Sequence, residues 1–79
     1  MAISRDELLT ILLEAVPPQA PRQYDPDKKL TESGLDSLDV SNFLLLVEER
    51  YDLKILDEDF ERINTLNDVV AYVNARLAA

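Results

Sequence analysis

The chain has 79 residues, of which 16 are Asp or Glu and only 8 are Lys or Arg, so its net charge is -8 at pH 7. A domain of this length has a thin core, and without Cys or His it lacks disulfides, thiolate metal sites and the commonest general base, so we predict neither an enzyme nor a metal site. The charge favours basic proteins over nucleic acid or anionic lipid as partners, although it would equally keep a small domain soluble.

A first helix is predicted over residues 5–16. Ser4 and Glu7 form a capping box, and apolar residues follow at helical spacing until Pro17-Pro18, which cannot continue a helix. The amino terminus carries acids where a targeting peptide would be basic, and no run nears the roughly 20 apolar residues that span a bilayer. We therefore expect a cytoplasmic protein that does not insert into membranes.

The segment 17–35 is predicted to be one long loop. It contains all four prolines and the only glycine of the chain, and its middle, Asp25-Pro-Asp-Lys-Lys29, is typical of a turn. Loops of this length in compact domains are usually either functional or disordered. Leu30 and Leu35 would anchor the far end to the core, so we expect that end to be ordered.

The strongest helix signal covers about residues 36–51. Asp36 is the expected N-cap, Asp39 adds a negative charge to the first turn, and no Pro or Gly follows before about Tyr51. Sorting the apolar residues by a period of 3.6 gives two faces. The first face is expected to point to the core and comprises Val40, Phe43, Leu44, Val47 and Tyr51.

The second face of this helix has surplus apolar residues bordered by acids. Leu38, Ser41 and Leu45 lie on it, and the polar side chains around it are Asp39, Asn42, Glu48 and Glu49. An apolar stripe edged by acids suits docking into a basic groove on a partner. The same stripe would also suit packing against the third helix or the long loop, and spacing alone does not separate these interpretations.

Two further helical segments complete the predicted fold. Residues 52–56 form a connector, 57–62 suits one or two short turns, and Thr65 can cap a last helix from Leu66 to about Leu77. The apolar stripe of that last helix comprises Leu66, Val69, Val70, Val73 and Leu77. We therefore predict an all-α fold in one domain over residues 1–79, a four-helix bundle of three main helices and one short helix, with a long loop between helices 1 and 2.

The segment Gly34-Leu35-Asp36-Ser37-Leu38 is where we expect function. Gly34 can adopt a positive φ and Asp36 can cap the helix, which would leave Ser37 exposed in the first turn. A phosphodiester on the Ser37 oxygen would meet free backbone N–H groups and the positive end of the helix dipole, worth about 0.3–1 kcal/mol at an exposed site. Taken alone, however, the local pattern is more often that of ordinary helix-start residues.

The same segment, extended to Asp39, resembles the G-x-D-S-L attachment motif of acyl carrier proteins and related carrier domains, which is the family's most specific signature. The number of helices, the long first loop and the position of the motif agree with that family. Four further stretches also resemble a stand-alone carrier, and they are residues 48–52, 55–59, 63–65 and 69–73.

The resemblance implies that Ser37 bears a covalent 4′-phosphopantetheine arm and that Asp36 is the acid of the motif. A separate phosphopantetheinyl transferase would move the arm from coenzyme A to the serine with Mg²⁺, and the terminal thiol would then bear an acyl thioester. This division of labour agrees with the lack of His and Cys, because nothing in the chain could activate Ser37 as a nucleophile.

The resemblance also implies where partner enzymes bind. Enzymes that load and process acyl groups would contact the second helix through basic docking surfaces, and family members are usually monomers. The residues implied in this partner face are Leu38, Asp39, Ser41, Leu45, Glu48 and Glu49.

Four residues depart from the pattern of fatty-acid carriers. Asn42 stands where Glu is usual, Ser41 where Val is usual, Arg50 follows the acid pair, and Leu56 replaces a usual Pro. These departures favour a specialised acyl, polyketide or aminoacyl pathway over a generic fatty-acid carrier. The alternatives are an aminoacyl or peptidyl carrier of the same fold and, in a different class, an unmodified acidic helical domain that binds a basic partner.

A cavity that shelters the cargo would lie between the second, third and fourth helices, and residue spacing does not give its volume. The side chains that we expect to line such a cavity are Leu44, Val47, Ile55, Ile63 and Tyr72.

Overall fold

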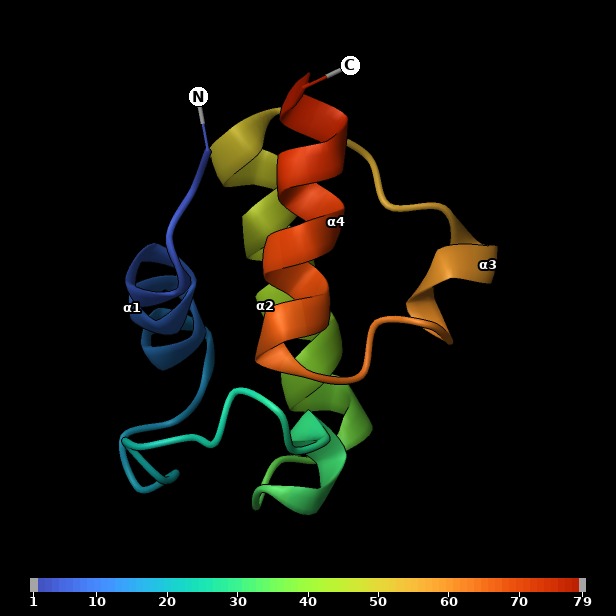
Figure 1. Cartoon of the computed structure of the whole chain (residues 1–79). Helices are drawn as coiled ribbons and strands as arrows, with labels where there is room; N and C mark the ends of the chain where they lie inside the picture. Colours follow the sequence, from blue (N-terminus) through green and yellow to red (C-terminus); the bar gives the residue numbers. More distant parts are fainter. Residues whose placement is uncertain (1, 79) are drawn as a thin grey trace.

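The computed structural model describes residues 2–78, and every regular element in them is helical (Figure 1). The α-helices are α1 (Arg5–Ala15), α2 (Ser37–Tyr51), α3 (Asp57–Phe60) and α4 (Leu66–Ala78), and a short 3₁₀ helix, η1 (Leu30–Glu32), lies within the long loop. In these residues the only β-type pairing is one isolated antiparallel bridge between Lys29 and Thr65. The predicted all-α fold of three main helices and one short helix is confirmed.

Two of the main helices begin at hydroxyl caps that the sequence predicts. At the start of α1, Ser4 Oγ accepts the N–H of Glu7 at 3.2 Å, and at the start of α4, Thr65 Oγ1 accepts the N–H of Asp68 at 3.0 Å. The end of α2 is marked by Asp52, which adopts the left-handed conformation with φ 52°. Because each hydroxyl cap involves residues three apart, the starts of α1 and α4 depend on local sequence alone.

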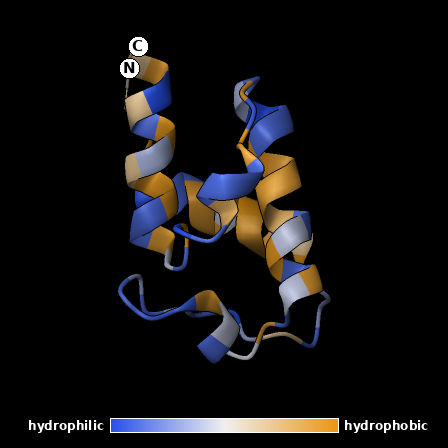
Figure 2. Ribbon diagram, turned by 90° about the vertical axis from the view of Figure 1, so that its right-hand side faces the viewer, coloured by the Kyte–Doolittle hydropathy of each residue, from blue (hydrophilic) through white to orange (hydrophobic). Residues whose placement is uncertain are grey.

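The three main helices are held together by α1, which packs against both α2 and α4. The short helix α3 lies on the other side, across the space between α2 and α4 (Figures 1 and 2). Two polar links join the rim of the α1–α2 contact: Arg50 Nη2 lies 3.0 Å from Glu14 Oε2, and the Tyr51 hydroxyl donates to Glu7 at 3.1 Å. Exposed ion pairs contribute only about 0.2–1 kcal/mol each, so apolar packing carries most of this contact.

The two ends of the described chain meet at one end of the bundle. The N–H of Ile3 donates to Asn74 Oδ1 at 2.7 Å, which joins the amino-terminal segment to α4. The start of α2, with Ser37, lies at the opposite end of the molecule (Figure 1).

Apolar side chains from every main helix form the core, and in Figure 2 hydrophobic ribbon of the main helices lies behind the hydrophilic α3. On α2, Phe43, Leu44 and Val47 are fully buried, whereas Val40 and Tyr51 pack against the core and are partly buried. The predicted core face of the second helix is therefore confirmed. Each fully buried aliphatic or aromatic side chain contributes about 1.5–3 kcal/mol relative to the exposed state.

The apolar stripe of α4 departs from the prediction at its last turn. Leu66, Val69 and Val73 are buried, but Leu77 is 38% exposed. Helical spacing does place Leu77 on the stripe, yet the last turn of α4 has only the amino-terminal segment and the end of α2 beside it. Leu77 therefore borders an open recess with Ile3 and Tyr51 instead of entering the core.

The far end of the long loop is ordered and anchored, as predicted. Leu30 and Leu35 are buried, the N–H of Leu30 donates to the carbonyl of Asn64 at 2.8 Å, and the N–H of Asn67 donates to the carbonyl of Pro26 at 3.1 Å. The helix η1 was not predicted, because three residues are too few to give a periodic signal. Its fixed position brings Leu30 close to the first turns of α2.

Two adjacent leucines of α2 test this packing. Leu44 is 0% exposed and Leu45 is 53% exposed. Leu44→Ala should lower the free energy of unfolding by about 2–5 kcal/mol, because burial is lost and a void remains. Leu45→Ala should stay within about 0.5 kcal/mol of the parent protein. Urea denaturation measures both, and equal losses would mean that the two faces of α2 are wrongly assigned.

Candidate functional site

The chain enters α2 through a turn that requires glycine. Gly34 has a φ of 94°, a conformation that other residues rarely adopt, and a Cβ at this position would lie 3.1 Å from Cγ of Pro21. Leu35, the next residue, is buried in the core. The turn and this anchor together fix the direction in which α2 begins.

Two aspartates close the first turn of α2 as a capping box. Asp36 Oδ1 accepts the N–H of Asp39 at 2.8 Å, and Asp39 Oδ2 accepts the N–H of Asp36 at 3.4 Å. Asp36 is thus the N-cap that the sequence predicts, and Asp39 completes the reciprocal pair. Between them, the N–H groups of Ser37 and Leu38 have no hydrogen-bond partner among residues 2–78, so they remain available to an anion.

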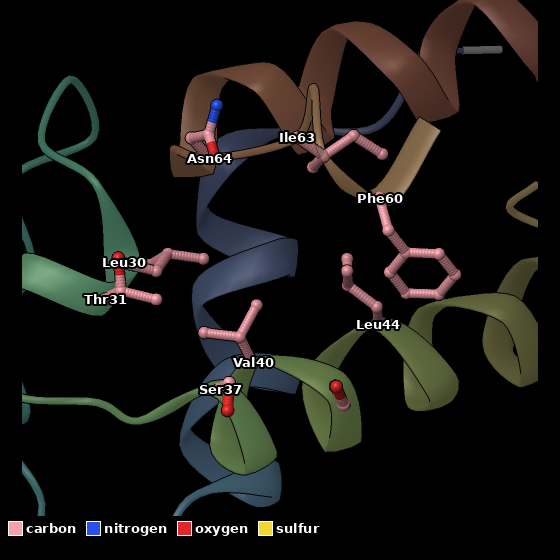
Figure 3. Close-up of a pocket in the computed structure, with 9 residues that line it drawn as sticks. Leu30, Thr31, Ser37, Val40, Leu44, Phe60, Ile63 and Asn64 are labelled. Carbon is pink, nitrogen blue, oxygen red and sulfur yellow. The ribbon is translucent and has the colours of Figure 1, made fainter. Parts of the chain in front are cut away.

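Ser37 is exposed and lies at the edge of a cavity of about 210 Å³. Figure 3 shows the apolar side chains of Leu30, Val40, Leu44 and Phe60 facing the space between η1, α2 and α3, with Ile63 closing it from the segment before α4. Small-molecule sites commonly have volumes of about 300–1,000 Å³, so this cavity suits a short apolar group. The polar side chains that share its lining are Thr31, Ser37, Ser41 and Asn64.

The lining of this cavity agrees only in part with the prediction. Leu44 and Ile63 line it as expected, but Val47 and Ile55 are buried in the core away from it. Tyr72 lies elsewhere too, bordering a separate recess that also has Ile63 on its wall. The prediction was wrong for these three residues, because it used helical spacing and could not place the long loop or α3.

The apolar centre of the predicted partner face is open to solvent. Leu38 is 66% exposed, Leu45 is 53% exposed, and Ser41 is also exposed. The alternative in which this stripe packs against the third helix or the long loop is therefore wrong. Two large apolar side chains on one exposed helix face are available for contact with another protein.

The acids predicted to border this face differ in what they bind. Asp39 belongs to the capping box, and Glu48 is half-buried, with Oε2 accepting the N–H of Ile55 at 2.7 Å. Glu49 is exposed, and no hydrogen bond to its side chain occurs in the described part of the chain. Sequence spacing groups the three acids, whereas the structure leaves Glu49 free and uses the other two carboxylates to bind the backbone.

The site presents a hydroxyl but has no group suited to activating it. Tyr24 lies near Asp39, and its pKa is raised, first by burial and further by that negative charge, although Arg22 opposes the shift. The phenol is therefore protonated at neutral pH and is not a base. The carboxylates of Asp36 and Asp39 accept backbone N–H groups, so a base that removes the Ser37 proton would have to come from another protein.

Two features are absent from residues 2–78, a metal-binding cluster of side chains and a membrane-spanning helix. No group of three or more acidic, His or Cys side chains is placed to hold a metal ion. None of the helices is both long enough and apolar enough to cross a bilayer.

Comparison with known proteins gives a family match over most of the chain. Residues 6–73 match the family model described as "Phosphopantetheine attachment site". A curated acyl carrier protein from Wolinella succinogenes is 31% identical over 68 residues, covering 86% of this chain and 90% of the relative. One from Bdellovibrio bacteriovorus is 40% identical over 58 residues, covering 66% of this chain and 74% of the relative. No solved structure gives a significant match.

The cap of α2 can be tested by two substitutions at one position. Asp36→Ala should lower the free energy of unfolding by about 0.5–2 kcal/mol, because the N–H of Asp39 loses its acceptor. Asp36→Asn keeps an acceptor oxygen and should recover most of that loss. Urea denaturation of both variants measures the difference. If Asn were as costly as Ala, the charge of Asp36 and not its hydrogen bond would be what stabilises the helix.

Proposed function

This chain belongs to the acyl carrier protein family, whose members carry phosphopantetheine and are not enzymes, and we propose that Ser37 is the residue that bears the arm. The observation that carries this proposal is the exposed Ser37 hydroxyl in the capped first turn of α2, at the edge of a cavity. In the attachment reaction the bond from Ser37 Oγ to phosphorus forms, and the bond from phosphorus to the nucleotide part of coenzyme A breaks. The hydroxyl proton passes to a base of the separate transferase.

The start of α2 fits a phosphodiester on Ser37, although only weakly. The free N–H groups of Ser37 and Leu38 and the positive end of the helix dipole favour the anion by about 0.3–1 kcal/mol at such an exposed position. The negative charges of Asp36 and Asp39 oppose it. A weak balance of this kind suits a carrier, because the first turn then leaves the arm free to enter the active sites of several enzymes.

We propose that the cargo consists of acyl intermediates of a specialised pathway, such as polyketide synthesis, or of fatty-acid synthesis. The cavity of about 210 Å³ supports a short cargo, and Ser41 adds a hydroxyl to its lining. An aminoacyl or peptidyl cargo on the same arm is the second candidate, favoured by the same polar lining. The protein would act in the cytoplasm as a monomer.

The exposed stripe of α2 is the proposed docking surface for the transferase and for the enzymes that load and process the acyl group. Its apolar centre is formed by Leu38 and Leu45, close to Ser37 on the same helix. The net charge of -8 favours basic surfaces on these partners. Of the bordering acids, Glu49 is the one with a free carboxylate, so it is the cleanest probe of the electrostatic part.

Loading tests the proposed attachment residue. After incubation with coenzyme A, Mg²⁺ and a broad-specificity phosphopantetheinyl transferase, intact mass should show one arm on the parent protein and none on Ser37→Ala. The variant should keep its stability within about 0.5 kcal/mol, because the side chain is exposed. Ser33→Ala, outside the partner face, is the control and should load normally.

If the Ser37→Ala variant still gained one arm, the attachment site would have to be another serine. No addition to any form, the parent included, would favour the unmodified acidic interaction domain instead.

A salt series tests the docking surface. Glu49→Lys should weaken the affinity for the transferase several-fold at low salt and less at high salt, because an exposed ion pair is worth about 0.2–1 kcal/mol and is screened. Leu38→Ala and Leu45→Ala should weaken it at least as much with little salt dependence, since burying a Leu contributes about 1.5–3 kcal/mol. Asp6→Lys on α1 makes the same change in net charge. If it weakened binding as much as Glu49→Lys, overall charge and not the α2 face would set the affinity.

A further inference from the structure

The wall of the cavity formed by α3 is held differently from the rest of the fold. This helix has four residues, none of them buried, and Phe60 at its end lines the cavity. Before α3, Glu48 accepts the N–H of Ile55 at 2.7 Å, and on α3 itself Asp59 Oδ2 accepts the hydroxyl of Tyr72 at 2.8 Å. Carboxylate hydrogen bonds thus hold α3 together with the buried Ile55 and Ile63 on either side of it, whereas the other helices bury residues of their own.

Three residues connect α3 to α4, and we name Asp59, Tyr72 and Arg76 the α3 latch. The Tyr72 hydroxyl donates to Asp59, and Arg76 Nη1 donates to that same hydroxyl at 2.9 Å, with its guanidinium 5.6 Å from the centre of the ring. The pKa of Tyr72 is raised, mainly by burial and further by the hydrogen bond to Asp59, so the hydroxyl keeps the proton that it donates. A hydrogen bond to a charged acceptor is of the stronger kind.

The other walls of the cavity are more deeply buried than α3. Leu44 is fully buried on α2, and Leu30 is buried on η1 with its N–H bonded to the carbonyl of Asn64. Phe60 is only partly buried. A cargo that exceeds about 210 Å³ would therefore gain room most easily by moving Phe60 and α3 outward, and this movement would separate Asp59 from Tyr72.

We propose that the α3 latch sets the longest acyl chain that the carrier shelters, with Tyr72 as the specificity-determining residue. The proposal rests on the proposed function, in which the acyl group on the Ser37 arm enters the cavity. Each added methylene is stabilised by burial until the cavity is full. A longer chain gains further burial only if the latch opens, and the lost hydrogen bond then offsets the gain.

Two tyrosines of this chain provide a matched test. Tyr72→Phe removes the hydroxyl of the latch and keeps the ring. Tyr51→Phe is the control, because it removes a similar hydrogen bond to a carboxylate, that of Glu7, at the α1–α2 contact away from the cavity. Asp59→Ala removes the acceptor of the same hydrogen bond.

The experiment measures how much each cargo raises the melting temperature. Parent and variants are loaded from acyl-coenzyme A with butyryl, hexanoyl, octanoyl, decanoyl or dodecanoyl arms, intact mass confirms the loading, and melting is compared with the form that carries the free thiol. In the parent and in Tyr51→Phe, the rise in melting temperature should stop increasing at the same acyl chain length. In Tyr72→Phe and Asp59→Ala it should continue for at least one more two-carbon step. In the double variant, which combines Tyr72→Phe with Asp59→Ala, the limiting chain length should be no longer than in either single variant.

Three results would count against the latch. The first is that the limiting chain length is identical in all the proteins. The second is that Tyr51→Phe lengthens this limit as much as Tyr72→Phe does. The third is that the two single-variant changes in the limit add up in the double variant. If Tyr72→Phe failed to fold, Asp59→Ala would decide, because it removes the same hydrogen bond without changing α4. A parent protein that took up no arm would instead reject the assignment of Ser37, and the mass spectrum reveals this before any melting is measured.

Discussion

The packing of α1 against both α2 and α4 is the contact on which the rest of the structure depends. Leu8, Ile11 and Leu12 are buried on α1 and meet the buried faces of the other two helices. A chain of 79 residues can build only a thin core around this contact. Little remains to bury α3, and two leucines of α2 remain outside altogether. A core of this size leaves both the exposed face of α2 and the residues of α3 outside it.

The end of the molecule that carries Ser37 is built from backbone geometry more than from reactive side chains. Gly34 permits the turn, Leu35 anchors it, and Asp36 ends it as the cap of α2. Ser37 then stands outside the core, where a large enzyme can reach it. Under the proposed function, a side chain able to activate this serine would gain nothing, because partner enzymes would perform the chemistry.

Most of the fold could be predicted from sequence because its signals are local. The caps at Ser4, Asp36 and Thr65 each involve residues three apart, and the core face of α2 follows from helical period. Contacts between separate elements could not be predicted in this way. Glu48 binds the N–H of Ile55 only because the left-handed Asp52 turns the chain back.

The cavity and its latch illustrate the same limit. Leu30 and Phe60 reach the cavity from a loop and from a four-residue helix, which have no periodic signal of their own. Tyr72 lies on the partly buried side of α4, and its bond to Asp59 joins positions thirteen residues apart. The candidate attachment segment, by contrast, is continuous in sequence, which is why Asp36 and Ser37 could be named before any contact was known.

The position of the two chain ends has a consequence for architecture on a larger scale. Ile3 is bonded to Asn74 at one end of the bundle, and Ser37 lies at the other. Any polypeptide joined at either terminus would extend from the end of the bundle that is remote from Ser37. The domain could therefore be one of several joined in a longer chain. The connections to neighbouring modules and the end that carries Ser37 would then lie at opposite ends of the domain.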